Sequence, residues 1–530
     1  MPLGHLALIL HAHLPFVRHP EHRDHLEERW LFEALTGSYL PLVAALKRLQ
    51  RDGVRARITV SISPPVIEML RDAVLCARFE AHLARLDRLG ARELERAAAD
   101  PDFGPAMLGH VEHLRAVRAA WSEAHGDVVG ALVELSRAGL VELWTSAATH
   151  GFLPALSQHP GVVNAQVAAG LDVFHRATGL HAKGFWLPEC GFAKGVDAVL
   201  ARHGVTCTAL ETHALLYADA RPRWAVAAPV ITPSGLACFG RDVSSGRQVW
   251  SRDEGYPGDP WYRDFHRDLG FERDAKEIEE FLAADGSRQA TGFKYHRVTG
   301  PGEEKLPYDP AAAKLRARVH AEHFVASRAA QLSWLAERVS GVAPVVVAPY
   351  DCELFGHWWF EGVDFLENVL RVTASRRDIS TVTPCEYLAK HPRHDQVTPE
   401  ESTWGEGGYS SVWLHPSNAW MLRHVDHACA EMTAIARAHR GADGLTARAA
   451  KQAARELLLL TASDYPFLIR TGGAPHYARA RFDAHLARFN RLAASLRTCD
   501  LDERWIADVE ARDNPFRHVD LDWFLAGDPS

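Results

Sequence analysis

The 530-residue sequence lacks the features that mark membrane, disulfide-rich and nucleic-acid-binding proteins. No window approaches the roughly 18 apolar residues of a membrane span, and no basic segment precedes the short apolar run at residues 6–10. None of the eight cysteines forms a CxxC pair, which argues against a zinc ribbon and a disulfide framework. With 59 Lys and Arg against 67 Asp and Glu, the net charge is −8. We therefore expect a cytoplasmic protein with no membrane and no nucleic-acid partner.

Two residue types are abundant instead, with 30 His and 15 Trp. Tryptophan offers a flat apolar surface to bases or sugar rings. Histidine can ligate metals, transfer protons or form hydrogen bonds to hydroxyl groups. A hydrophobic content of 47% with 24% charged residues describes an ordinary globular chain that can bury a sizeable core. The composition leaves a base, a sugar or a metal as possible ligands.

Short apolar segments of strand length alternate with helical patterns along most of the chain. We predict strands at residues 5–10, 57–62, 141–145, 184–187, 206–210, 345–348 and 379–382. The pattern is almost wholly helical over 66–140 and again from 417 to 497, whereas 239–305 is typical of long loops. This organisation favours an α/β fold, namely an incomplete (β/α) barrel with an inserted and a C-terminal helical domain. We assign residues 1–70 and 141–402 to the barrel, 71–140 to the insertion and 403–530 to the C-terminal domain, which contributes to the active site.

Histidines follow two of the predicted strands, at the strand ends where barrel enzymes build their active sites. His11 and His13 alternate along a strand and so point to one side. They form either half of a metal site or a hydrogen-bonding pair, and the lack of an adjacent acid favours the second. His150 comes after the strand at 141–145, where a helix start capped by Thr149 is an equally good interpretation.

Carboxylates follow two other strands. Glu189 comes directly after an apolar strand and a proline, and its alternative role is that of an acid at a helix start. Asp351 ends another apolar run, and Glu353 and His357 are spaced so that on a helix they would share a face. These three residues could ligate a metal, or His357 could simply pack against the helix.

Tryptophans in a glycine-rich segment complete the candidate site. Trp404 and Trp413 lie where helical packing does not explain them, so each either stacks on a sugar ring or covers the edge of the core. Two carboxylates among aromatics are the minimum set for glycoside hydrolysis, and a retaining enzyme holds them about 5–5.5 Å apart. For Asp351 to act as the acid, its pKa must lie above that of Glu189.

Five segments, taken in order, resemble glycoside hydrolase family 57. They are residues 11–15 (HAHLP), 144–151 (WTSAATHG), 186–189 (WLPE), 350–358 (YDCELFGHW) and 403–406 (TWGE). The similarity extends to residues 28–31, 38–41, 292–295 and 463–466, and so spans nearly the whole chain. Within the family the chain looks most like the members that branch 1,4-α-glucans.

The resemblance implies a (β/α)7 barrel and a double displacement on α-1,4-glucan. It implies Glu189 as the nucleophile and Asp351 as the general acid/base. The implied substrate-binding residues are His11, His13, Trp30, His150, Arg263, Gly292, His357, Trp404, Trp413 and Asp464. It implies no metal and no cofactor, and an α-glucan as the partner of a monomer or small homo-oligomer. The alternatives are an α-amylase or 4-α-glucanotransferase of the same family, a metal-dependent carbohydrate deacetylase, and a non-catalytic glucan-binding protein.

Two departures from the family pattern concern the balance between transfer and hydrolysis. Branching members commonly carry a tyrosine in a mobile loop, which we expect near residues 237–256, where Cys238 takes its place. The segment Thr471-Gly472-Gly473 lacks the glutamine that relatives often have after the first glycine.

Overall fold

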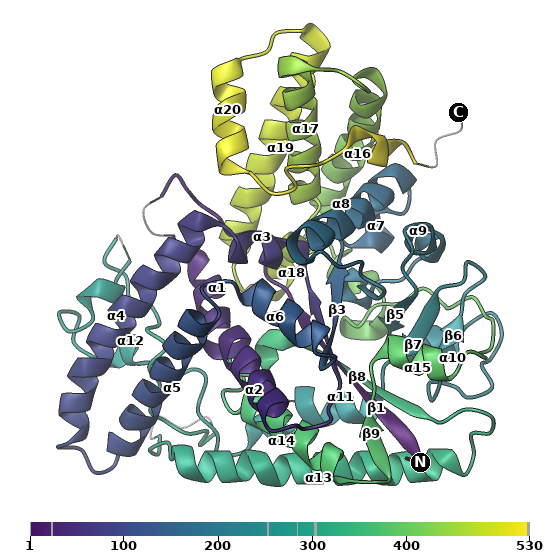
Figure 1. Ribbon diagram of the computed structural model, residues 1–530. Helices are drawn as coiled ribbons and strands as arrows, with labels where there is room; N and C mark the ends of the chain where they lie inside the picture. Colours follow the sequence, from purple (N-terminus) through teal and green to yellow (C-terminus); the bar gives the residue numbers. More distant parts are fainter. Residues whose placement is uncertain (1, 23–24, 252–253, 284, 301–304, 527–530) are drawn as a thin grey trace.

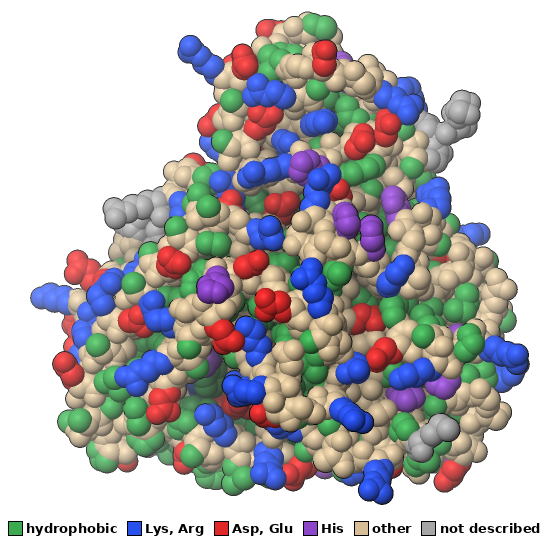
Figure 2. All heavy atoms as spheres, in the orientation of Figure 1, with side chains coloured by type: hydrophobic (Ala, Val, Ile, Leu, Met, Phe, Trp, Pro, Cys, Tyr) green, Lys and Arg blue, Asp and Glu red, His purple; other side chains and the backbone are tan. Residues whose placement is uncertain are grey.

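The computed structural model describes the chain except for residues 1, 23–24, 252–253, 284, 301–304 and 527–530 (Figure 1). Among the described residues, no helix combines the length and apolarity needed to cross a bilayer. Acidic and basic side chains are interspersed on the face shown in Figure 2, without a continuous basic stripe.

A parallel barrel forms the centre of the molecule. Its strands are β1 (Gly4–Ala12), β2 (Ile58–Ile62), β3 (Val141–Ser146), β4 (Phe185–Trp186), β5 (Cys207–Leu210), β7 (Ala237–Gly240) and β8 (Val345–Asp351). Five of them pair in the order β4-β3-β2-β1-β8, and β5 pairs with β7. Single bridges from Gly184 to Cys207 and from Arg241 to Val347 join the two groups. The seven strands thus form a closed ring. This confirms the expected (β/α)7 barrel, which is incomplete only in having fewer strands than the common eight-stranded barrel.

The predicted strands are present, but the long-loop prediction was wrong for part of 239–305. β7 begins just before this stretch, and it is followed by α11 (Val243–Trp250). A two-residue strand, β6 (Val230–Ile231), lies antiparallel to β7. Cys238 is therefore a fully buried strand residue and does not replace a tyrosine in a mobile loop. The four residues of β7, ending in glycine, carry too little pattern to be distinguished from a loop.

Two helices of the predicted insertion project from one side of the barrel (Figure 1). They are α4 (Ala73–Ala97) and α5 (Gly104–Glu123), which pack on each other. The third, α6 (Val128–Arg137), packs on β3 and on α2 (Leu40–Arg51), as a helix of the barrel's own outer layer does. The predicted end of the insertion at residue 140 is not tested. The packing of α6 on β3 and α2 favours an earlier end, before α6.

Most of the remaining helices lie around the barrel, and the short helix at residues 269–272 lies beside α4 (Figure 1). They are α1 (Glu28–Ala34), a π-helical turn (Leu35–Tyr39), α3 (Pro64–Leu70), α7 (Leu153–Leu156), α8 (Pro160–Thr178), α9 (Val196–Arg202), α10 (Thr212–Leu216), α12 (Leu269–Glu272), α13 (Pro310–Ala336), α14 (Gly362–Ser375) and α15 (Pro384–Lys390). The last short strand, β9 (Ile379–Thr381), pairs with the beginning of β1. Long α13 lies against α14, at the bottom of Figure 1.

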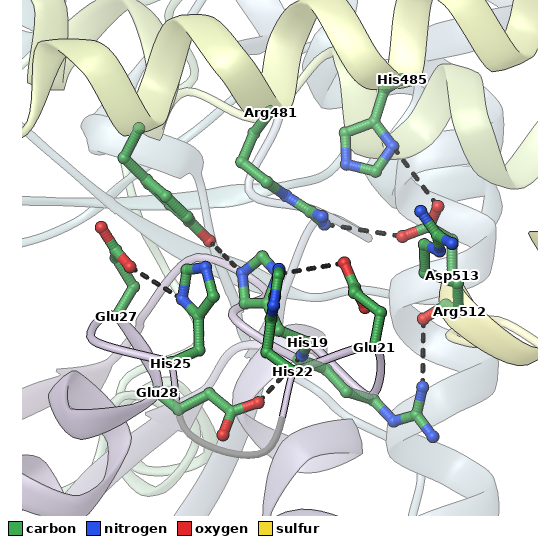
Figure 3. A network of polar contacts seen from close by, with 12 residues as sticks. His19, Glu21, His22, His25, Glu27, Glu28, Arg481, His485, Arg512 and Asp513 are labelled. Atoms are coloured by element: carbon green, nitrogen blue, oxygen red, sulfur yellow. Dashed lines mark hydrogen bonds and ion pairs between the residues drawn. The ribbon is translucent and has the colours of Figure 1, made fainter. Parts of the chain in front are cut away.

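A helical bundle forms the C-terminal part, at the top of Figure 1. It consists of α16 (Leu422–Ala438), α17 (Gly444–Leu460), α19 (Pro475–Thr498) and α20 (Glu503–Arg512), with short α18 (Asp464–Thr471) facing the barrel. Figure 3 shows how the loop after β1 meets this bundle. His19 bonds the hydroxyl of Tyr477 at 3.0 Å, and Arg18 donates to the backbone oxygen of Arg512 at 3.1 Å. These contacts attach α19 and α20 to the loop after β1.

Candidate active site

The carboxyl ends of the barrel strands bring the predicted polar residues together. His11 is paired in register with Ser61 of β2 and with Asp351 of β8. His150 follows β3, and Glu189 follows β4. Both have left-handed backbone angles, with φ of 55° and 60°. Such angles are costly for residues with a Cβ and persist where the surroundings enforce them, often at functional sites.

Three histidines form a stacked group above these strand ends. The Nε2 atoms of His11 and His150 are 3.0 Å apart, and the rings of His13 and His150 stack at 3.8 Å. His11 also stacks on Trp186 at 4.6 Å. The Nδ1 atoms of His11 and His13 bond the hydroxyls of Ser61 and Ser63. The ring nitrogens lie within 4.8 Å of one another, as in a metal site, but these hydrogen bonds occupy them, which favours the hydrogen-bonding interpretation.

The histidines differ in charge. Burial lowers the pKa of His11 and of His150 well below the ordinary value, so both are neutral near pH 7. Burial opposes the charge of His13 too, but Asp464, whose oxygens lie 3.2 and 3.3 Å from Nε2, raises its pKa above the ordinary value. The site therefore contains one imidazole that favours a positive charge, close to both α18 and Glu189.

Glu189 receives two hydrogen bonds from the C-terminal part of the chain. The indole N–H of Trp404 donates to Oε2 at 2.9 Å, and the hydroxyl of Ser463 donates to Oε1 at 3.2 Å. Burial raises the pKa of Glu189, while the Trp404 bond and the charge of His13 act in the opposite direction. Both donors stabilise the ionised carboxylate, which is the form a nucleophile needs.

The surroundings of Asp351 favour its protonated form. Burial, followed by the nearby carboxylates of Glu353 and Glu189, raises its pKa well above the ordinary value, against a smaller effect of Arg241. Arg241 is itself paired with Glu211 at 3.0 Å. The raised pKa favours the protonated form of Asp351, which is the form that can donate a proton to a leaving oxygen. Burial raises the pKa of both carboxyl groups, and their roles as nucleophile and general acid/base stay a prediction.

Glu353 contacts other residues of the site and does not lie on an α-helix. It lies in a 3₁₀ turn (Cys352–Leu354), where its Oε1 accepts the hydroxyl of Tyr39 and, at 3.1 Å, the backbone N–H of His13. Burial raises its pKa to about 7. The expectation that Glu353 and His357 share a helix face was wrong, because the chain turns after Leu354 and does not continue as a helix.

Three other predicted residues line a separate cavity. Arg263, Gly292 and His357 surround a space of about 240 Å³ between α1, α5 and the segment around residue 292, and neither Glu189 nor Asp351 is among its lining residues. The Arg263 guanidinium lies 3.6 Å from the ring centre of Phe360. Gly292 has φ of 84°, which glycine adopts without strain. The structure thus divides the predicted binding residues into a catalytic group and a second group.

The predicted tryptophans have unequal surroundings. Trp404 lies against Glu189, and half-buried Trp30 packs edge-on against Tyr477 at 5.5 Å. Trp413 is only 3% exposed and stacks on Phe152 at 4.5 Å. Its packing favours the alternative of a tryptophan that covers the core edge, so a direct glucan contact of Trp413 stays a prediction.

Sequence reasoning missed several residues that complete the site. Ser63, Arg241 and Ser463 were not predicted, although each is adjacent to a strand end or to a recognised segment. Arg241 directly follows β7, and a charged residue in that position was the available signal. Tyr39 lies in the recognised segment 38–41, but nothing in that segment indicated that its hydroxyl reaches Glu353 from the end of a π-helical turn.

Comparisons with known proteins agree with this arrangement. The model of glycosyl hydrolase family 57 matches residues 7–399, and the C-terminal model of 1,4-alpha-glucan branching enzyme matches residues 424–524. The chain is 34% identical to a 1,4-alpha-glucan branching enzyme of Thermococcus kodakarensis, over 99% of this chain and 79% of that protein.

Two solved structures resemble the whole chain. The alpha-amylase AmyC from Thermotoga maritima superposes with a TM-score of 0.92 at 35% identity, covering 98% of this chain and 99% of that one. A family 57 branching enzyme from Pyrococcus horikoshii gives a TM-score of 0.88 at 33% identity, covering 100% and 98%. One neighbour is named for hydrolysis and the other for branching.

Proposed function

The chain belongs to glycosyl hydrolase family 57, and we propose that it is a retaining 1,4-α-glucan branching enzyme. The observation that carries the proposal is the pair Glu189 and Asp351 at the same end of the barrel, where Glu189 accepts two hydrogen bonds and the pKa of Asp351 is raised well above its ordinary value. The match of residues 424–524 to the C-terminal region of branching enzymes supports transfer as the outcome.

The first step uses both carboxyl groups. Glu189 attacks the anomeric carbon of an α-1,4-linked glucose unit while Asp351 gives its proton to the departing glycosidic oxygen. The product is a covalent glycosyl-enzyme, with the leaving chain released as an alcohol. Trp404 and Ser463 hold the Glu189 carboxylate in place for the attack.

The second step reverses these roles. Asp351, now ionised, takes the proton from the 6-hydroxyl of an acceptor glucan, whose oxygen attacks the anomeric carbon and releases Glu189. The new bond is an α-1,6 branch. Water in place of the acceptor gives hydrolysis, so the yield of branches depends on acceptor binding and on exclusion of water.

The binding roles follow the two groups of residues. His11, His13, His150 and Asp464 line the position of the donor sugar, whose hydroxyls exchange with hydrogen bonds that these side chains make to one another, and Trp30 and Trp404 provide aromatic surface at its edge. The cavity of Arg263, Gly292 and His357 takes a further part of the glucan chain.

The test is the product made from amylose. Incubation followed by enzymatic debranching and chain-length analysis should reveal short side chains, and proton NMR should show new α-1,6 anomeric signals. Reducing ends without new α-1,6 linkages would instead make the protein an α-amylase, the activity named for its Thermotoga maritima neighbour.

A further inference from the structure

A cluster of cysteine and glutamate lies at the end of the barrel opposite the catalytic group. Glu142 is at the amino end of β3, Cys207 begins β5, and Cys385 lies in the first turn of α15. One thiol or carboxylate atom from each residue lies within 4.8 Å of the other two. Cys207 is fully buried, whereas Cys385 is partly exposed. Three segments far apart in the sequence thus bring two soft ligands and one hard ligand to one point.

The spacing of the two sulfur atoms fits tetrahedral metal coordination. Their separation is 3.9 Å. Two zinc–sulfur bonds of about 2.3 Å at a tetrahedral angle place the sulfurs about 3.8 Å apart. A disulfide would require about 2.05 Å, so that either the strand or the helix would have to move. A disulfide between the two cysteines would give the Glu142 carboxylate no role, whereas a bound cation would use it as a third ligand.

The surroundings give the cluster orientation and access. The indole N–H of Trp144 donates to one Glu142 oxygen at 2.6 Å, and Thr383 caps α15 through the backbone of Glu386. Outer contacts of this kind fix a ligand's direction at metal sites. A surface cavity of about 350 Å³, lined by Glu142 and Cys385 and also by His181 and Lys183, leads to the cluster.

We propose that Cys207, Cys385 and Glu142 form a binding site for a thiophilic divalent cation, with zinc as the fitting ion. On binding, the two thiols lose their protons to solvent and become thiolate ligands, Glu142 supplies one oxygen, and the cavity side leaves the fourth position to water. The ion joins β3, β5 and α15 at the amino ends of the strands. Glucan turnover does not require the ion, because residues at the amino-terminal face of a barrel contribute to stability and not to catalysis.

Cobalt and zinc titrations of the full-length chain test the site. Protein treated with a chelator and kept in a phosphine reductant is titrated with Co²⁺, then with Zn²⁺ against a chromogenic chelator. We expect one ion per chain, with a near-ultraviolet sulfur-to-cobalt charge-transfer band and the strong visible bands of tetrahedral cobalt. Zinc should also raise the melting temperature, because it binds only the folded chain.

Three substitutions define the ligands. Cys385→Ser and Cys207→Ser should each weaken zinc binding by more than the roughly 10- to 100-fold that loss of an outer-shell partner costs. Glu142→Gln keeps both thiols, and should retain the charge-transfer band while weakening the affinity. Cys499→Ser, which removes an exposed thiol of the C-terminal bundle, is the matched control and should bind as the parent does.

The proposal fails if the parent chain takes up no stoichiometric ion, or if Cys385→Ser binds as tightly as Cys499→Ser. It also fails if the protein loses two mass units on mild oxidation and binds no metal when reduced, since the pair is then a disulfide. Glucan turnover is expected to be the same in all four variants, so these results are independent of the proposed function.

Discussion

The catalytic group and the second group are both buried and polar, yet they are built differently. Around Glu189, the carboxylate oxygens and the histidine nitrogens form hydrogen bonds with named neighbours. Around Arg263, cationic and acidic side chains, among them Lys294 and Glu33, surround an open space of about 240 Å³. We therefore propose that the first group serves proton transfer and that the second holds a hydroxyl-rich chain.

This difference gives an expectation for kinetics. Changes in the catalytic group should lower kcat, because its contacts act on charge that develops in the transition state. Changes around the cavity should mainly raise KM, because its contacts are made to the bound chain in the ground state and the transition state alike. Measured values of kcat and KM thus test whether the two groups are separate in function as they are in space.

The largest effect is expected for Glu189→Gln. The amide cannot attack the anomeric carbon, and kcat on amylose should fall by about 10,000-fold or more, as for other lost nucleophiles. Glucan binding, measured by affinity electrophoresis, should remain. Glu406→Gln is the control, because this acid is highly exposed. A loss below about tenfold would remove Glu189 from the nucleophile's role.

A smaller effect on the same carboxylate is expected for Trp404→Phe. This change keeps an aromatic ring but removes the N–H that donates to Oε2 of Glu189. Loss of a charge-assisted hydrogen bond of roughly 1.5–3 kcal/mol should lower kcat about 10- to 100-fold. The pKa of Glu189 should rise, so the acidic limb of the kcat profile should move to higher pH. An increase in KM alone would show that Trp404 serves only as a sugar platform.

The barrel strands were predictable because each is a short apolar run followed by a polar residue at the site. Glu189 and Asp351 carry this signal, since a carboxylate directly after a buried strand is unusual for structural reasons alone. The separation of Arg263 from Glu189 was not predictable, because motifs give order along the chain and not distance in space. Ser463 and Tyr39 act through single hydrogen bonds from remote segments, for which the sequence has no period or spacing.

At the cavity, Arg263→Lys should change binding more than rate. Lysine keeps the charge but loses the flat guanidinium that lies on Phe360. We expect KM for amylose to rise about tenfold, the equivalent of roughly 1.4 kcal/mol, with kcat changed less than twofold. Arg338→Lys, where the arginine lies over Trp334 on the outside of α13, is the matched control. A fall in kcat with KM unchanged would place Arg263 in the catalytic group.

The smallest expected effect is a shift in the pH dependence of kcat, which tests whether the catalytic group and the cavity group are electrostatically independent. Glu353 raises the pKa of Asp351, so Glu353→Gln should lower that pKa. Asp351 then loses its proton at lower pH, and the alkaline limb of kcat should move to lower pH by about one unit or less. Glu33→Gln is the comparison, because Glu33 is a partly exposed acid whose pKa is also raised to about 7, but it lines the cavity. Its removal should leave the alkaline limb in place. If both variants shift that limb equally, the cavity and the catalytic group form one electrostatic unit, and the division between them does not hold.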